Sequence, residues 1–162
     1  AFIAGRLEGV LRDAGHPVGI VKAVVAENAH DPHAARQAAA ALAEAVRLPD
    51  WPALLNAYAR CVRITRPLPQ RYSLRPDDLA LPEERAVLDE LTRAEAERLA
   101  ADGSVETFVA ALRRLEPAIT RLFDAVLIMD DDPTVRENRL ALLQRVAGLA
   151  GGVAELSGLE GF

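Results

Sequence analysis

Apolar residues recur three and four positions apart along almost the whole chain, and no stretch alternates apolar and polar residues convincingly with a period of two. This spacing is typical of amphipathic helices, which bury one face. We therefore expect an all-α fold, a bundle of about seven helices that ends in a long antiparallel helical hairpin. The expected helices cover residues 2–14, 18–28, 32–47, 50–65, 82–101, 104–131 and 133–157.

Prolines and N-capping residues set the limits of these helices. Asp132 is a good N-cap, and Pro133 fits the first helical position, where its missing N–H would be unpaired anyway. Pro117 lies inside the expected helix 104–131 and should bend or divide it. Residues 66–82 contain four prolines and cannot form regular helix. A loop of this length in a compact domain is uncommon and tends to be functional or mobile.

The last expected helix carries a narrow apolar stripe with two polar residues at its border. At about 100° per residue, one stripe about 60° wide contains Val135, Leu142, Val146, Leu149, Val153 and Leu156. Asn138 and Arg139 border it, and leaving a buried polar group unpaired costs about 1–3 kcal/mol. If the hairpin turns near Asp131, Asp124 lies level with both residues. We therefore expect Asp124 to pair with Arg139, and Asp124, Asn138 and Arg139 to hold the hairpin together.

The length of 162 residues suits one well-buried core, so we expect a single domain over residues 1–162. Because the chain starts without Met, we expect it to be a piece of a longer protein. No apolar run approaches the ~20 residues that span a membrane, and nothing resembles a signal peptide, so we expect a soluble cytoplasmic protein without a membrane partner. Cys61 is the single cysteine, which excludes an intrachain disulfide; its apolar neighbours indicate a core position.

Acidic residues form two motifs that a metal ion might seem to explain. Asp31, which follows His30 and precedes Pro32, is a sufficient N-cap, and the three histidines lack the further carboxylates of a metal site. The run Asp130-Asp131-Asp132 is favoured by the dipole of the helix that it precedes. Glu83, Glu84 and the carboxylates of 89–106 are interpreted as solvent-facing. No phosphate loop, activated nucleophile or adenylate-forming motif is found, so we expect no catalytic residue, metal or cofactor in this chain.

Positive charge is densest just before and within the 66–82 loop. Arg60, Arg63, Arg66, Arg71 and Arg75 occur with no acidic residue between Arg60 and Asp77. Arg60 and Arg63 are one turn apart and project from one face, and Tyr72 adds an aromatic plane. Guanidinium groups beside an aromatic ring suit single-stranded RNA, whose phosphates need positive charge and whose splayed bases stack. The alternative is a solvated arginine face that pairs with the acidic residues of 77–90.

Net charge is −5, which argues against the broad basic surface of indiscriminate nucleic-acid binding. We therefore expect no DNA partner, and any contact with RNA must be local.

Several motifs follow one order along the chain. They are Asp13-Ala-Gly-His-Pro-Val-Gly-Ile-Val-Lys-Ala-Val-Val-Ala, Tyr58-Ala-Arg-Cys-Val-Arg-Ile, Phe-Asp-x-Val-x-x-Met at 123–129, Arg-x-Asn-Arg-Leu-x-Leu-Leu at 136–143 and Val-Ala-Glu-Leu-Ser-x-Leu at 153–159. Together they resemble the C-terminal anticodon-binding (DALR-type) domain of the bacterial glycyl-tRNA synthetase β subunit. The resemblance covers roughly residues 6–159 and departs from the family pattern at Leu122, at Arg63 and in 149–152.

This resemblance implies a domain that grips the anticodon stem-loop of glycine tRNA and positions the tRNA for glycylation catalysed elsewhere. The implied partners are glycine tRNA and the synthetase α subunit or α region, with ATP and Mg²⁺ in the catalytic part of the parent enzyme. We expect RNA binding by Arg60, Arg63, Arg66, Arg71 and Tyr72, with Arg136 as a weaker candidate on the exposed side of its helix. Asp124, Asn138 and Arg139 are expected to be structural. Two alternatives are a protein-interaction bundle without an RNA role and the equivalent domain of an arginyl-type synthetase.

Overall fold

The computed structural model describes residues 2–100 and 103–162, and within them the chain is helical without any strand. Seven α-helices occur in the described residues: α1 (Phe2–Asp13), α2 (Val18–Asn28), α3 (Pro32–Ala45), α4 (Trp51–Thr65), α5 (Pro82–Ala100), α6 (Val105–Ala125) and α7 (Pro133–Ala147). The expected all-α helical bundle is confirmed. Across the same residues, no helix is both long and apolar enough to cross a membrane.

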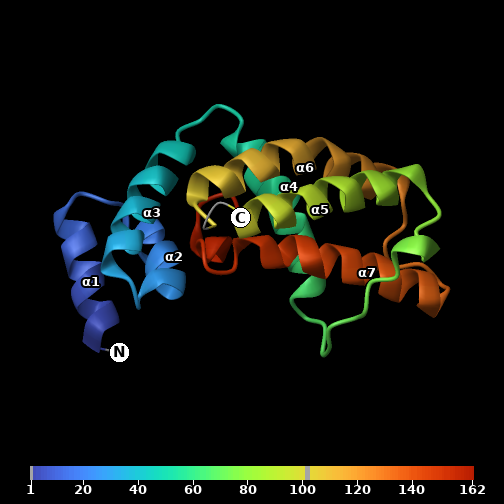
Figure 1. Cartoon of the computed structure of the whole chain (residues 1–162), viewed down its shortest axis with the longest axis horizontal. Coiled ribbons are helices and arrows are strands. Elements are labelled where there is room, and N and C mark those ends of the chain that lie inside the picture. The colour runs from blue at the N-terminus through green and yellow to red at the C-terminus, as the bar shows by residue number, and fades with distance from the viewer. Residues whose placement is uncertain (1, 101–102) are drawn as a thin grey trace.

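The helices form two groups that share one apolar core (Figure 1). Helices α1–α3 lie at one end of the molecule, and α4–α7 form a longer bundle beside them. The C-terminal segment after α7 ties the groups together, because the Glu155 N–H donates to the Ala23 carbonyl of α2 at 2.8 Å. Asn28 of α2 also donates to the Val153 carbonyl at 2.9 Å. These contacts fix α2 against the longer bundle.

The predicted N-caps are confirmed where prolines open helices. Asp31 accepts hydrogen bonds from the His33 and Ala34 N–H groups at the start of α3, and these bonds lower the pKa of its carboxyl. Asp132 accepts from the Thr134 N–H at the start of α7, at 2.8 Å. Both carboxylates satisfy donors that a helix N-terminus leaves without intrahelical partners.

Helix α6 ends at Ala125, six residues earlier than expected. In the connector that follows, Val126 and Ile128 are buried while Leu127 and Met129 are exposed. Val126 is already extended, with φ −123° and ψ 129°. This alternation is the pattern of extended backbone, and Val and Ile suit it because their branched side chains stiffen χ1. Pro117 does not divide α6, which continues through it.

Helix α7 ends at Ala147, ten residues earlier than expected, and two 3₁₀ turns follow at Gly148–Ala150 and Leu156–Gly158. Gly152 between them has φ +75°, a conformation that favours glycine. Arg98 of α5 donates to the carbonyls of Gly148, Leu149 and Gly151, and so satisfies backbone groups at this helix end. Leu149, Val153 and Leu156 of the predicted stripe are nevertheless buried.

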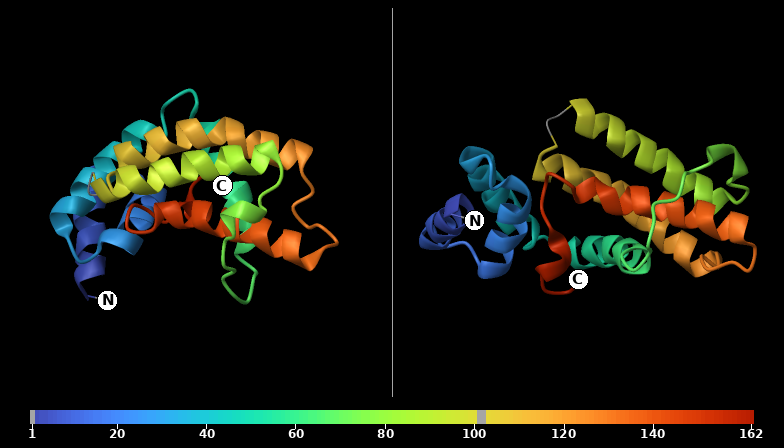
Figure 2. Two further views of the ribbon diagram at one scale, coloured as in Figure 1. Left: turned by 45° about the vertical axis from the view of Figure 1, so that its right-hand side comes forward. Right: turned by 90° about the horizontal axis from the view of Figure 1, so that it is seen from below.

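Helices α6 and α7 run in opposite directions and are joined at the end of the molecule that lies away from α1–α3 (Figure 2). The main neighbours of α7, however, are α4 and α5, and α6 packs mainly on α5 and α4. Helices α6 and α7, which we expected to form a hairpin, therefore each pack on α4 and α5 more than on each other. Helix α5 and the 66–81 loop therefore lie against α7 where we expected α6 to lie.

Cys61 lies in the core, as predicted, where burial raises the pKa of its thiol to about 12. Its neighbour Tyr58 is buried too, and its hydroxyl donates to the Ala147 carbonyl at 2.7 Å. This hydrogen bond joins α4 to the end of α7. Helix α4, which also carries Arg60 and Arg63, is thereby fixed against α7.

Candidate nucleic-acid interface

The second half of α4 and Arg66, the residue that follows it, present three arginines on one side of the helix. Arg60, Arg63 and Arg66 are spaced three residues apart, so they spread over about 120° of the helix surface with Arg63 in the middle. The Arg60 guanidinium carbon lies 4.2 Å from the centroid of the Phe123 ring of α6, and that of Arg66 lies 5.7 Å from the Phe162 ring. Such cation–π contacts hold a guanidinium in place without neutralising its charge.

The arginines of this face have no carboxylate partner. Among the described residues, no Asp or Glu oxygen forms an ion pair within 4.0 Å of Arg60, Arg63, Arg66 or Arg71. Three of the acidic residues in 77–90 pair with other arginines: Asp78 with Arg75, Glu84 with Arg139 and Glu90 with Arg114. The alternative of arginines paired with residues 77–90 therefore holds for Arg75, which pairs with Asp78, but not for Arg60, Arg63, Arg66 or Arg71. We call Arg60, Arg63, Arg66 and Arg71 the arginine face.

The loop after α4 lies along α7 and is attached to it at successive points. The Gln144 side chain accepts from the Tyr72 N–H at 2.9 Å and donates to the Gln70 carbonyl at 2.8 Å. Further along, Asn138 accepts from the Arg75 N–H at 2.7 Å and donates to the Arg75 carbonyl at 2.9 Å. The loop thus runs antiparallel to α7. Its shape is set by two side-chain amides, each of which replaces the backbone pairing that a loop lacks.

The structure places the other expected RNA residues differently from one another. Arg71 is exposed on the loop, whereas Tyr72 is half-buried and packs against the core. Arg136 was expected on the exposed side of its helix, which is wrong: it is half-buried, and its guanidinium donates to the Asp130 carbonyl at 2.7 Å. The arginine face and Tyr72 are brought together around the end of α4, while Arg136 lies near the other end of α7. Their contact with RNA stays a prediction.

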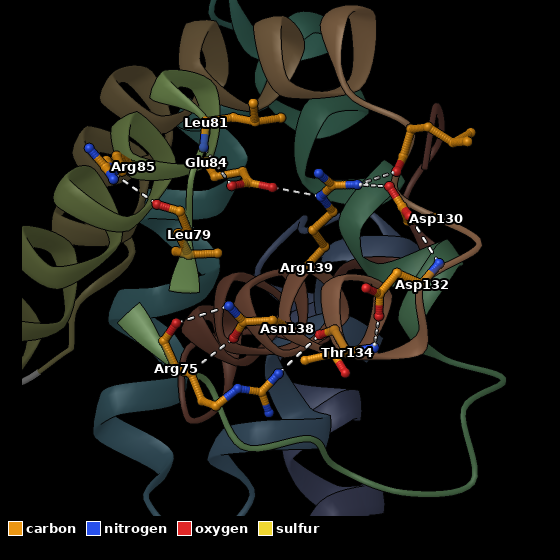
Figure 3. Close-up of polar contacts among 11 residues, drawn as sticks. Arg75, Leu79, Leu81, Glu84, Arg85, Asp130, Asp132, Thr134, Asn138 and Arg139 are labelled. Atoms are coloured by element: carbon orange, nitrogen blue, oxygen red, sulfur yellow. Dashed lines mark hydrogen bonds and ion pairs between the residues drawn. The ribbon is translucent and has the colours of Figure 1, made fainter. Parts of the chain in front are cut away.

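Arg139 is the centre of a buried polar network (Figure 3). Its side chain donates to Glu84 at 2.6 Å, to Asp130 at 2.8 Å and to the Leu127 carbonyl at 2.9 Å. The expected pair with Asp124 is therefore wrong, and Asp124 is exposed on α6. The physical reason is the packing of α7 against α5, which brings a carboxylate from α5 to Arg139 before one from α6 can reach it.

Glu84 was expected to face solvent, which is also wrong, since only 2% of its surface is exposed. Its second carboxylate oxygen accepts from the Leu81 N–H at 2.9 Å. Glu84 is the third residue of α5, the position from which a Glu can cap the residue before the helix. The sequence carried this local signal. It carried none for the pairing with Arg139, which lies 55 residues further along the chain.

Asn138 is 2% exposed, and its hydrogen bonds are to the Arg75 backbone, so it fastens the loop and not the expected hairpin. Asp130 lies in the acidic connector, residues 126–132 between α6 and α7. The hydrogen bond from the Asp132 N–H and, to a smaller extent, the one from Arg139 lower the pKa of its carboxyl. Across the described residues, no group of three or more His, Cys, Asp or Glu side chains lies close enough to hold a metal ion.

The profile of one protein family, described as the DALR anticodon binding domain, matches residues 54–156. That span begins inside α4 and includes α5–α7, the loop and the Arg139 network. The chain belongs to the DALR anticodon-binding domain family. The predicted resemblance is confirmed.

Similar proteins carry the name of one ligase. The glycine–tRNA ligase β subunit of Anaeromyxobacter dehalogenans (strain 2CP-C) is 34% identical over 98% of this chain, and that of Aromatoleum aromaticum is 35% identical over 98%. The chloroplastic/mitochondrial glycine–tRNA ligase 2 of Arabidopsis thaliana is 31% identical over 99% of this chain. The chain spans 23% of the length of each bacterial subunit and 15% of the plant protein. It corresponds to one segment of these longer proteins.

Proposed function

We propose that this DALR domain binds the anticodon stem-loop of glycine tRNA as the non-catalytic, tRNA-positioning part of a glycine–tRNA ligase. The observation that carries the proposal is the arginine face, whose four guanidinium groups have no carboxylate partner among the described residues. Each such cation can neutralise a phosphate without first giving up an ion pair. The names of the similar β subunits support the choice of glycine over arginine as the amino acid of the parent enzyme.

Binding would be local because the chain as a whole is acidic, with a net charge of −5. An acidic molecule with one basic face repels a polyanion that approaches from elsewhere, so the tRNA is oriented as it binds. Chemistry belongs to the parent enzyme: its α subunit or α region would activate glycine with ATP and Mg²⁺. We place the enzyme in the cytoplasm, where bacterial translation takes place. The task of this domain is to hold the anticodon end while the acceptor end reaches that catalytic site.

A binding titration of the isolated chain tests the proposal. We expect it to bind glycine tRNA more tightly than the same tRNA with a scrambled anticodon loop, and to lose affinity steeply as salt rises, since phosphate contacts release counterions. Supplied with ATP and glycine, the chain alone should form no glycyl-tRNA. Equal, salt-insensitive binding of both RNAs would instead favour the protein-interaction bundle, and glycylation by the chain alone would refute a non-catalytic role.

A further inference from the structure

A groove with a volume of about 390 Å³ lies between the end of α4, the following loop and the end of α7. Its polar lining comes from Thr65, Arg66, Gln70, Arg71 and Gln144, and its apolar lining includes Val62, Leu68 and Ala147. Small-ligand sites are commonly about 300–1,000 Å³, so the groove is large enough for one nucleotide. It adjoins the arginine face, two of whose members line it.

The lining of the groove is cationic. Arg66 and Arg71 lie on it without an ion-pair partner, and no Asp or Glu is among the residues that line it. The remaining lining combines apolar residues, among them Val62, Leu68 and Ala147, with the uncharged polar residues Thr65, Gln70 and Gln144. A ligand that matches both properties is anionic at one end and flat and largely apolar at the other. An unpaired nucleotide, with its phosphate and its splayed base, has this combination.

Gln144 gives the groove a fixed wall. Both ends of its side-chain amide are engaged with the loop, at Tyr72 and at Gln70. The loop is therefore fixed on α7 before any ligand binds. Binding does not have to order the loop, so the entropic cost of binding is smaller. Because both ends of its amide bind the loop, Gln144 is assigned a role in holding the loop in place.

We propose that this groove receives one unpaired nucleotide of the tRNA anticodon loop, with its phosphates at Arg66 and Arg71 and its base on the apolar floor. Gln144 is the positioning residue that preforms the site. This inference rests on the proposed function and adds to it a defined pocket for a single base. It also separates a residue that shapes the site from the arginines that supply its charge.

The test uses an RNA hairpin that carries the anticodon loop of glycine tRNA, with the fluorescent base 2-aminopurine placed at one loop position at a time. In the wild-type chain we expect one position to change its fluorescence strongly on binding. Gln144→Leu should abolish that change and weaken binding about tenfold by removing preorganisation. It should leave the salt dependence of affinity unaltered, since no charge is lost. Gln37→Leu, on the distant helix α3, is the matched control and should behave as wild type.

A second variant guards against a general folding defect. Gln144→Glu keeps the acceptor for the Tyr72 N–H, loses the donor to Gln70 and adds a carboxylate that repels the RNA phosphate, so it should weaken the same fluorescence change while the melting temperature stays near wild type. The groove is ruled out if the RNA hairpin binds but 2-aminopurine responds at no loop position. It is also ruled out if Gln144→Leu and Gln144→Glu reduce the fluorescence change equally at every loop position. Failure of the wild-type chain to bind the hairpin at all would overturn the proposed function and this inference together.

Discussion

Replacing Arg139 by alanine is expected to lower the melting temperature by roughly 6–20 °C. The change leaves the Glu84 carboxylate buried and without its cation, and the side chain of Glu84 is only 3% exposed. Removing one member of a buried pair costs about 3–5 kcal/mol, and in a protein of this size each kcal/mol shifts the melting temperature by about 2–4 °C. Thermal denaturation followed by circular dichroism measures the effect.

Arg145 provides the control on the same helix. It pairs with Glu95 of α5, but the Arg145 side chain is 41% exposed and the Glu95 side chain is 34% exposed. Exposed pairs contribute about 0–1 kcal/mol, so Arg145→Ala should change the melting temperature little.

Combining Arg139→Met with Glu84→Gln should cost less than the sum of the two single changes, because the second removes a charge already unpaired. Equal losses in Arg139→Ala and Arg145→Ala would show that burial of the network is unimportant.

Changing Arg60 and Arg63 together to alanine is expected to weaken tRNA binding and to reduce the slope of log affinity against log salt by about 1–2 units. Each phosphate contact that is lost reduces the number of counterions released on binding. Neither arginine has a carboxylate within ion-pair distance among the described residues. Filter-binding or fluorescence titrations at several salt concentrations give the slope for the wild type and the variant.

The matched control changes the same number of charges elsewhere. Arg93 and Arg113 are exposed but paired, with Glu97 at 3.2 Å and Asp50 at 2.6 Å. Replacing both by alanine gives the same net charge as the first variant, so it separates a local contact from a general electrostatic effect. The salt slope of this control should stay at the wild-type value. A slope that falls equally in both variants would mean that overall charge, and not the arginine face, governs binding.

The helices were largely predictable from sequence because their starts carry local signals. Asp31 and Asp132 precede prolines and cap α3 and α7 as expected. The ends were harder. Residues 126–129 are all apolar, so their sequence does not separate a helix from extended backbone, and which one forms depends on the core surface that they meet. The end of α7 had a signal in Gly151 and Gly152, but the carbonyls there are satisfied by Arg98 from another helix.

The candidate site was predictable where it rests on composition and not where it rests on tertiary pairing. The arginine face follows from residue spacing on α4. Glu84, the buried partner of Arg139, and Arg75, the partner of Asn138, lie more than 50 residues away in sequence, and no local pattern encodes these two pairings. Gln144, which fastens the loop, gave no signal because a single glutamine on a helix is usually solvent-exposed.

The most direct test of the account is a map of the RNA surface by NMR. The ¹⁵N-labelled chain would be titrated with the isolated anticodon stem-loop of glycine tRNA while its backbone amide shifts are followed. We expect the largest changes in residues 60–72 and 144–148, on the arginine face and around the groove. Changes confined to α1–α3 or to the acidic connector at 126–132, with residues 60–72 unaffected, would contradict it.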